Sequence, residues 1–416
     1  MFYFLISRVI DLIIARIASM FIPYLGFFPY KEIFSDYKLP SFISSFANFD
    51  GAQYLIIIRE GYNNLTQAYF PLYPLFVKFL SPLFSNNHLL TGLLLSNLSF
   101  LIALKLFKQF NNINNLTILF LLLFPTSFFF GALYTEGLFF LLVILVLWGL
   151  QKKKYWLVAI AGFLAALTRL IGVFLIIPIG FHIINQYQIS KIKNQNHSLK
   201  VKDKNNTHIS PVTGYKFHGF NVTRYTLHVS RFFHLLTTIY YLLTPILGLL
   251  TYMTYLWKTT GDPLFFFNSQ PVFGANRSTY LIFLPQVYYR YFKIFFTATL
   301  DFQYFISMFE FIIFNFSFSI LILYFVKSWQ KFKGKGFRLW LFTEEVGLII
   351  FSLTNLILPT LTGTFSSIPR YALMSLSVFI YLGEIKSGWI KIIIGCFFGI
   401  LHVLILGFFI QGYFVG

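Results

Sequence analysis

The sequence has few charged residues and almost no cysteine. Only 11% of its 416 residues are charged, whereas a soluble domain carries roughly a quarter. Cys396 is the only cysteine, which excludes an intrachain disulfide and a thiolate metal cluster. It lies in an apolar run, where we expect a small buried hydrophobic residue. The composition therefore excludes an ordinary soluble domain.

Acidic residues are also scarce, with 13 Asp and Glu against 32 Lys and Arg and a net charge of +19. A basic chain can bind nucleic acid. Here the Lys and Arg residues lie mainly in short links between apolar runs, which is the positive-inside pattern of membrane proteins. We therefore expect a lipid bilayer, and no nucleic acid, as a partner.

Three functional patterns are missing from the sequence. It has no glycine-rich phosphate loop, so nucleotide use has no support. The histidines of residues 197–228 are too evenly scattered for a metal site. No internal repeat of the kind found in secondary transporters is evident. We therefore expect neither a metal nor a cofactor.

Apolar runs of about 20 residues recur along the whole chain. Because backbone polar groups in lipid must bond to one another, these runs predict an all-α, multi-pass membrane protein. We expect a single integral membrane domain over residues 1–416, with about eleven transmembrane helices. The expected spans are 1–28, 89–107, 116–132, 137–150, two short helices within 155–184, 233–257, 302–326, 341–361, 372–384 and 392–410.

Two long polar segments interrupt these runs. Residues 29–85 are predicted to form a large extracytoplasmic loop, with segments 55–58 and 72–84 lying as helices in the membrane interface. Residues 185–231 are predicted to form a basic cytoplasmic loop, an insertion that is partly disordered. Both ends of residues 155–184 would then be cytoplasmic, so we expect a hairpin with Arg169 near its tip.

The outer loops contain the polar residues that the spans lack. An outer site with a few acids and several arginines suits the transfer of a group from an anionic lipid phosphate to a neutral nucleophile. A carboxylate would act as general base, and arginines would hold the departing phosphate. The polar residues of these loops are Glu32, Asp36, Asp50, Arg59, Glu60, Glu136, Asp262, Arg277 and Arg370.

Five groups of short motifs occur in order between residues 47 and 371. They are Phe49–Tyr54 with Glu60–Tyr62 and Phe70–Pro74, then Pro125–Glu136, Ala166–Arg169, Gly261–Leu264 followed by Arg277, and Pro369–Tyr371. In order and spacing they resemble the PIG-V-like mannosyltransferases, which include the second mannosyltransferase of GPI-anchor assembly and prokaryotic relatives. The basic loop is an unmatched insertion. Where the family commonly has a Trp beside the Asp, this chain has Phe49 and Gln53, a difference that affects the acceptor contacts.

The resemblance implies a GT-C-type fold and an inverting glycosyltransferase. The donor would be a polyprenyl- or dolichyl-phosphate sugar, with mannose as the family's sugar, and the acceptor a glycolipid or glycan hydroxyl. Asp50 would be the catalytic base and Glu136 a second acid or sugar contact. The expected substrate-binding residues are Arg370, Arg169, Arg277, Tyr371, Asp262 and Tyr54. We expect a prokaryotic plasma membrane with the site facing outward, or alternatively the endoplasmic reticulum membrane.

Each of these residues also has a purely structural interpretation. Asp50 and Glu136 can cap the helices that follow them, which contributes about 1 kcal/mol per cap. The arginines can extend toward lipid headgroups, and Asp262, which lies between Gly and Pro, is a natural turn residue.

Two other functions remain open at this stage. A transporter or lipid flippase without catalysis would use charges near the bilayer midplane, such as Arg8, Asp11 and Arg16. Asp50 would then be dispensable. A GT-C enzyme that glycosylates protein or cell-wall glycan would keep the same site with a different acceptor.

Overall fold

The computed structural model describes residues 1–26, 30–63, 65–110, 113–205, 222–273, 277–333 and 337–415. Within these ranges the chain folds into helices and contains no β-strand. The all-α prediction is therefore confirmed.

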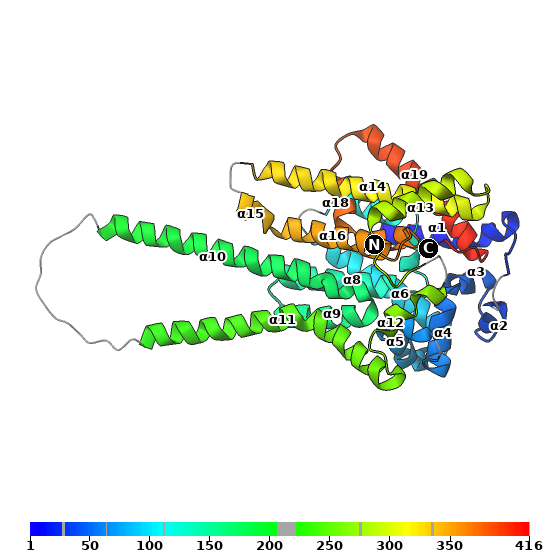
Figure 1. The fold of residues 1–416 in the computed structure, drawn as a ribbon, viewed down its shortest axis with the longest axis horizontal. Coiled ribbons are helices and arrows are strands. Elements are labelled where there is room, and N and C mark those ends of the chain that lie inside the picture. The colour runs from blue at the N-terminus through cyan, green and yellow to red at the C-terminus, as the bar shows by residue number, and fades with distance from the viewer. Residues whose placement is uncertain are drawn as a thin grey trace, which may run out of the picture.

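The first part of the chain is one long helix followed by a series of short ones (Figure 1). The short helices occupy most of the predicted loop 29–85. The helices of this part are α1 (Phe2–Phe21), α2 (Tyr30–Ser35), α3 (Ser41–Ser44), η1 (Ser45–Ala47), α4 (Asp50–Glu60), η2 (Thr66–Ala68), α5 (Leu72–Leu80) and η3 (Ser81–Phe84).

The middle of the chain contains longer helices that pack side by side. The pairs α6 and α8, α8 and α9, and α9 and α11 lie against each other. These helices are α6 (His88–Phe107), α7 (Asn115–Leu123), η4 (Ser127–Phe130), α8 (Glu136–Gln151), α9 (Tyr155–Thr168), η5 (Leu170–Leu175), α10 (Ile176–Asn205) and α11 (Val222–Thr260).

The last part returns to the same bundle, where α16 packs on α10 and α19 packs on α1. Its helices are α12 (Phe265–Asn268), η6 (Gln270–Phe273), α13 (Leu284–Thr297), α14 (Phe302–Lys331), α15 (Phe337–Leu341), α16 (Glu344–Thr360), α17 (Ile368–Tyr371), η7 (Ala372–Met374), α18 (Leu376–Glu384) and α19 (Gly388–Ile410).

Side-chain caps fix where several of these helices begin. The Asn87 carboxamide accepts a hydrogen bond from the Leu90 N–H at 3.0 Å. Asn114 does the same for Thr117 at 2.8 Å, and Asp301 for Tyr304 at 2.9 Å. Each cap satisfies a backbone donor that the first helical turn leaves free.

Four segments of the described chain are long and apolar enough to cross a membrane. They are His88–Phe107, Leu170–Lys191, Phe302–Lys331 and Gly388–Ile410. The sequence predicted about eleven spans. Several of the remaining predicted spans are helices of 17 residues or fewer, such as α8, α9 and α16, and α1 contains Arg8, Asp11 and Arg16.

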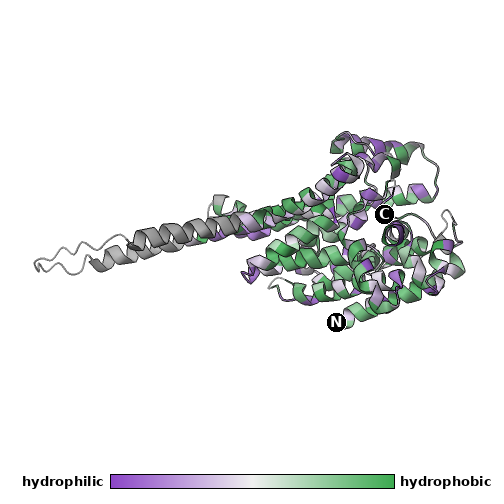
Figure 2. Ribbon diagram, turned by 90° about the horizontal axis from the view of Figure 1, so that it is seen from below, coloured by the Kyte–Doolittle hydropathy of each residue, from purple (hydrophilic) through white to green (hydrophobic). Residues whose placement is uncertain are grey.

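Hydrophobic residues predominate along many helices of the bundle, with hydrophilic ones among them (Figure 2). Large hydrophobic side chains are exposed on α1, on α6 and on α19, for example Val9, Leu98 and Ile393. A soluble protein rarely presents so much contiguous apolar surface. Helices of this length with apolar outer faces are what a bundle in lipid presents.

The chain breaks near Arg169, as the sequence predicted. Helix α9 ends at Thr168, Arg169 is extended with φ −155° and ψ 146°, and η5 follows at once. The turn is tight, because a Cβ at Gly172 would lie 2.4 Å from the Ala165 carbonyl oxygen. Residues 155–184 therefore form two helical segments that meet at Arg169.

Three details differ from the sequence predictions. Helix α10 continues to Asn205 and α11 begins at Val222, so both extend into the predicted loop 185–231; residues 206–221 lie outside the described ranges. Leu55, Ile57 and Ile58 are buried, so this segment packs inside the fold instead of lying at a surface. Cys396 is exposed on α19, on a stretch where Ile393, Phe397 and Ile400 are exposed as well.

Candidate functional site

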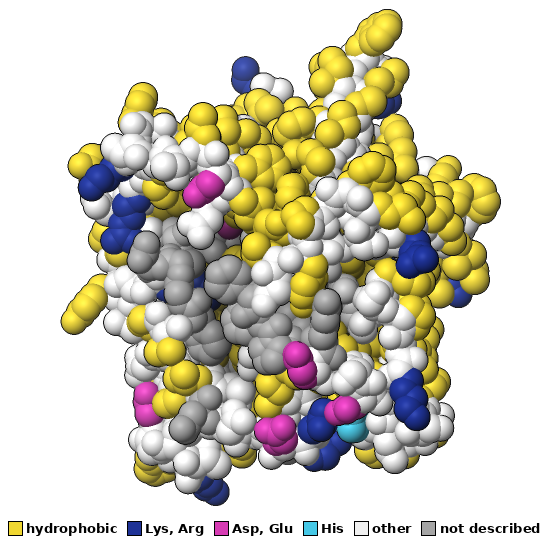
Figure 3. Space-filling model, turned by 90° about the vertical axis from the view of Figure 1, so that its right-hand side faces the viewer, with side chains coloured by type: hydrophobic (Ala, Val, Ile, Leu, Met, Phe, Trp, Pro, Cys, Tyr) yellow, Lys and Arg dark blue, Asp and Glu magenta, His cyan; other side chains and the backbone are white. Residues whose placement is uncertain are grey.

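A cavity of about 400 Å³ lies at the end of the bundle where α4, η5 and α17 meet. Figure 3 shows the molecule from one end, with hydrophobic side chains gathered over the upper part of the view, Lys and Arg mainly toward the margins, and several Asp and Glu within the face. The cavity has a polar part and an apolar part. Its polar side chains include Asp50, Tyr54, Tyr69, Tyr134, Thr135, Arg169, Gln270, Arg277, Thr362, Ser367, Arg370 and Tyr371.

Asp50 is the first residue of α4, and the chain before it is held from several sides. The Asn48 side chain donates to the Phe409 carbonyl at 2.9 Å, and the Asn48 carbonyl accepts from the Tyr134 hydroxyl at 2.7 Å. Phe49 has φ 58° and ψ −114°, which L-residues rarely adopt. Strained backbone of this kind concentrates at functional sites.

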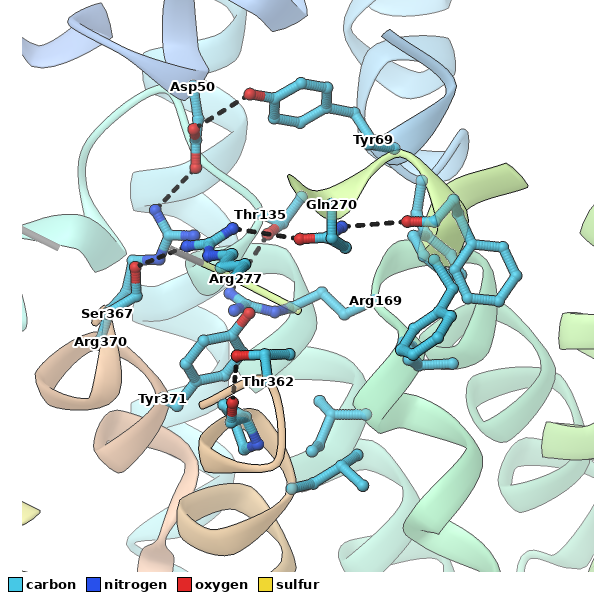
Figure 4. Close-up of a pocket in the computed structure, with 18 of the residues that line it drawn as sticks. Asp50, Tyr69, Thr135, Arg169, Gln270, Arg277, Thr362, Ser367, Arg370 and Tyr371 are labelled. Carbon is cyan, nitrogen blue, oxygen red and sulfur yellow. Dashed lines mark hydrogen bonds and ion pairs between the residues drawn. The ribbon is translucent and has the colours of Figure 1, made fainter. Parts of the chain in front are cut away.

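The Asp50 carboxylate has two partners (Figure 4). Arg370 Nη1 forms an ion pair with Oδ2 at 2.7 Å, and the Tyr69 hydroxyl donates to Oδ1 at 3.2 Å. The side chain is still 22% exposed and faces the cavity. Asp50 does not cap α4 with its side chain, so the structural interpretation of this residue as a cap is wrong.

Glu136 is a second carboxylate that pairs with Arg370, and unlike Asp50 it is fully buried. Its side chain is 1% exposed, and Oε1 pairs with Arg370 Nε at 3.1 Å and with Arg169 Nη1. It does not line the cavity. Its contacts are therefore with the two arginines, whereas the sequence predicted a catalytic acid or sugar contact here.

Arg370 and Tyr371 lie on the short helix α17, which begins after an unusual residue. Ser367 has φ 66°, the left-handed conformation that costs non-glycine residues about 1 kcal/mol. Its backbone N–H donates to Glu310 Oε1 at 3.1 Å, and Glu310 Oε2 accepts from the Tyr291 hydroxyl at 2.8 Å. This buried carboxylate on α14 therefore fixes the start of α17.

Electrostatics at the site are dominated by the arginines. Burial opposes the charge on Arg370, but Asp50 and Glu136 outweigh it and raise the pKa of its guanidinium. Burial alone would raise the pKa of Tyr371, yet Arg169, Arg370 and Arg277 together lower that pKa below its usual value. The Arg169 guanidinium also lies 4.9 Å from the centre of the Tyr371 ring.

The tyrosines near Asp50 stay protonated. Burial, followed by the charge of Asp50, raises the pKa values of Tyr54, Tyr69 and Tyr134. Tyr54 packs edge-on against Tyr69, with ring centroids 5.2 Å apart. These residues therefore offer neutral hydroxyl donors beside the carboxylate.

The cavity also has an apolar part. Residues of η5 and of the C-terminal end of α16 contribute to it. The apolar lining residues of these two segments are Leu170, Ile171, Phe174, Leu358, Pro359 and Leu361, and Leu281, which lies just before α13, lines the cavity as well. The cavity therefore suits a ligand with a charged group and an apolar part.

Most residues predicted as a site from sequence come together in this cavity. Asp50, Tyr54, Arg169, Arg277, Arg370 and Tyr371 all line it, and Glu136 lies directly behind two of them. Asp262 does not: Oδ1 accepts from the Leu264 N–H at 2.8 Å and Oδ2 from the Asn268 amide at 2.7 Å. It forms a turn, so its predicted role in substrate binding is not supported.

Sequence reasoning missed four residues of the site. Tyr69 and Gln270 are polar residues among aromatic ones, and no sequence pattern marked them as site residues. Glu310 did give one, because an acid inside an apolar span is rare and usually functional. Ser367 is identified only by its conformation.

The fold and the cavity together define a helical protein with membrane-length helices and a buried cluster of acids and arginines that faces an amphipathic cavity. In the described part of the chain, no group of three or more His, Cys, Asp or Glu side chains is placed to hold a metal ion. No family model, curated protein or solved structure matches the chain.

Proposed function

We propose that the protein is a multi-pass inverting glycosyltransferase of the GT-C type. It would transfer a hexose, with mannose as the first candidate, from a polyprenyl- or dolichyl-phosphate sugar to a hydroxyl of a glycolipid or glycan. The observation that carries the proposal is Asp50, a carboxylate that faces a cavity lined by three arginines and by an apolar wall.

In this reaction Asp50 is the general base. It accepts the proton of the acceptor hydroxyl while the hydroxyl oxygen attacks the anomeric carbon from the face opposite the leaving group. The bond between the anomeric carbon and the phosphate oxygen breaks, and the lipid phosphate leaves with the electron pair. A positioned base of this kind contributes about 10²- to 10⁴-fold to a rate.

The surroundings of Asp50 suit that role. Its partners Arg370 and Tyr69 hold the carboxylate at 2.7 Å and 3.2 Å while leaving it open to the cavity. The arginines provide positive charge where the phosphate oxygen becomes negative. The leaving group carries a single phosphate, so the proposal requires no metal.

The proposal includes the finer features expected from the sequence. The chain would cross the membrane about eleven times, and the cavity would open on the extracytoplasmic side of a prokaryotic plasma membrane. The order of motifs from Phe49–Tyr54 to Pro369–Tyr371 supports the GT-C assignment, because each of the five groups contributes at least one residue to the lining of one cavity.

The test is transfer of radiolabelled mannose from polyprenyl-phosphate mannose, with membranes that contain the protein and a crude lipid extract as acceptor. Wild type should form a labelled product and Asp50→Asn should not. The matched control is Asp301→Asn, which removes the same charge at an exposed helix cap where Asn caps equally well. Wild-type transfer by Asp50→Asn would refute the assignment of the base. No transfer by wild type with any lipid-phosphate sugar would refute the function.

A further inference from the structure

The three arginines of the cavity are not equivalent. Arg370 pairs with Asp50 and Glu136, and Arg169 pairs with Glu136. Arg277 has neutral partners instead: Nη1 donates to Gln270 Oε1 at 3.1 Å, and Nη2 to Ser367 Oγ at 3.4 Å (Figure 4). Among the described residues, no carboxylate forms an ion pair with Arg277.

The acid nearest to these partners is already engaged. Glu310 accepts one hydrogen bond from Tyr291 and one from the Ser367 backbone. It lies behind Ser367 and does not line the cavity. Arg277 therefore presents to the cavity a guanidinium charge that no carboxylate of the described residues contacts directly.

The Arg277 side chain is half-buried, and a guanidinium that is partly removed from water without a carboxylate partner is stabilised when an anion binds to it. Gln270 holds Arg277 in place, and its own amide donates to the Phe266 carbonyl at 3.0 Å. The planar guanidinium binds phosphate through two parallel N–H donors. The arrangement therefore suits an incoming anion at Arg277.

We propose that Arg277 binds the phosphate of the donor, and that Arg370 and Arg169 are positioning residues that hold Asp50 and Glu136. This inference rests on the proposed function, because it identifies the donor subsite of the same cavity. Different residues then receive the proton and the leaving group: Asp50 takes the acceptor proton, and Arg277 binds the departing phosphate.

The apolar wall indicates what accompanies the phosphate. Ile171 and Phe174 from η5, and Leu358 and Leu361 from the C-terminal end of α16, line the cavity together with its polar residues. An isoprenoid chain would bury apolar surface there, which contributes about 25 cal/mol per Å². The ligand class is therefore a phosphate monoester or diester of a long apolar alcohol, in contrast to a free phosphate ion.

The experiment measures binding without turnover. The full-length protein is placed in phosphatidylcholine nanodiscs and titrated with radiolabelled undecaprenyl phosphate. Arg277→Gln should weaken binding about tenfold or more, and Arg277→Lys should recover part of the loss. The control is Arg59→Gln, which removes an exposed arginine that pairs with Asp36 outside the cavity and should bind as wild type does.

A second variant keeps the inference testable if Arg277→Gln does not fold. Asp50→Asn removes one of the two negative partners of Arg370, so the variant should bind undecaprenyl phosphate as tightly as wild type or more tightly, while losing transfer. Weaker binding by Asp50→Asn would contradict the separation of roles. This readout is independent of transfer, so it distinguishes failure of the donor subsite from failure of the proposed reaction.

Inorganic phosphate provides the last arm of the test. It should displace undecaprenyl phosphate only at concentrations at least about a hundredfold higher than those of the unlabelled lipid phosphate. Equal displacement by both would show a free-phosphate site and overturn the lipid assignment. Wild-type binding by a folded Arg277→Gln, or loss of binding in a folded Arg370→Lys instead, would overturn the role of Arg277.

Discussion

Two clusters of buried charge in this molecule can be compared directly. The cavity cluster consists of Asp50, Glu136, Arg169 and Arg370. The α1–α19 cluster consists of Arg8 and Asp11 on α1 and His402 on α19. Each contains a carboxylate almost without exposure, since the side chains of Glu136 and Asp11 are 1% and 3% exposed.

The α1–α19 cluster is closed on itself. Asp11 Oδ2 pairs with Arg8 at 3.1 Å and Oδ1 with His402 Nε2 at 2.8 Å. Arg8 also donates to the Ser127 carbonyl at 3.4 Å, and none of the three residues lines the large cavity. These contacts join α1 and α19, so we interpret the cluster as structural.

The comparison teaches that buried charge alone does not identify a site. Burying an ion pair is costly, and folded proteins retain such pairs for structural as well as functional reasons. The difference lies in what the charges face: one cluster fills a helix contact, whereas the other borders an open cavity. A transport function based on Arg8 and Asp11 would first have to break their contacts.

The largest expected difference in transfer activity and in stability is between Asp50→Asn and Asp11→Asn. Asp50→Asn should lower transfer about 10²- to 10⁴-fold with little change in stability, because it removes the base. Asp11→Asn should destabilise the fold by up to about 3–5 kcal/mol, because it leaves the half-buried Arg8 without its ion pair. Transfer per folded molecule, obtained from activity and thermal unfolding in detergent, should stay at the wild-type level for Asp11→Asn.

The reverse result would favour the alternative function. Transfer or transport that depends on Asp11 in folded protein, together with full activity of Asp50→Asn, would make the α1–α19 cluster the functional one.

The next prediction concerns stability within the cavity cluster. Glu136→Gln leaves both Arg169 and Arg370 without their shared carboxylate, whereas Arg370 keeps Asp50. We expect a loss of about 3–5 kcal/mol in the free energy of unfolding. Glu60→Gln on the exposed end of α4 is the control and should change stability by less than about 0.5 kcal/mol. If the free energy of unfolding of Glu136→Gln equalled that of wild type, the Glu136 carboxylate would not be what stabilises the two arginines.

Much of this site could be predicted from the order of residues in the sequence, and some could not. The motifs around Asp50, Glu136, Arg169 and Arg370 identified all four residues of the cluster. Their pairing was not predictable, because Asp50 and Arg370 are 320 residues apart and only the fold brings them together. Sequence therefore suggested that Arg370 holds phosphate, whereas in the structure it holds Asp50.

The fold was predicted at the level of its class. Apolar runs predict helices reliably, because both periodicity and composition favour them. The number of spans was harder, because helices such as α8 and α9 have only 16 and 14 residues, and most of α8 is buried. Hydrophobicity alone does not separate a helix that faces lipid from one that is enclosed by its neighbours.

A smaller effect can be produced without changing any charge. In Gly172→Ala, the added Cβ would lie 2.4 Å from backbone atoms of Ala165, so η5 must move and displace Arg169. Overpacking of this kind costs about 1–3 kcal/mol, and transfer should fall as well. The control is Gly180→Ala on α10, where the nearest atom is 3.8 Å away and alanine favours the helix by about 1 kcal/mol. Equal unfolding temperatures for the two variants would contradict the tight packing at the Arg169 turn.

The smallest predicted effect tests one hydrogen bond to Asp50. Tyr69→Phe removes the hydroxyl that donates to Asp50 Oδ1 at 3.2 Å and should lower transfer about tenfold, since hydrogen bonds to charged groups contribute about 1.5 kcal/mol or more. Burial and Asp50 raise the pKa of Tyr69, so the phenol stays protonated and the loss should be the same from about pH 6 to about pH 9. Tyr280→Phe, on an exposed tyrosine that is 83% accessible, should leave transfer unchanged. A loss that disappeared above pH 8 would mean that the wild-type phenol ionises there, and the hydroxyl would then not be the donor that holds the base.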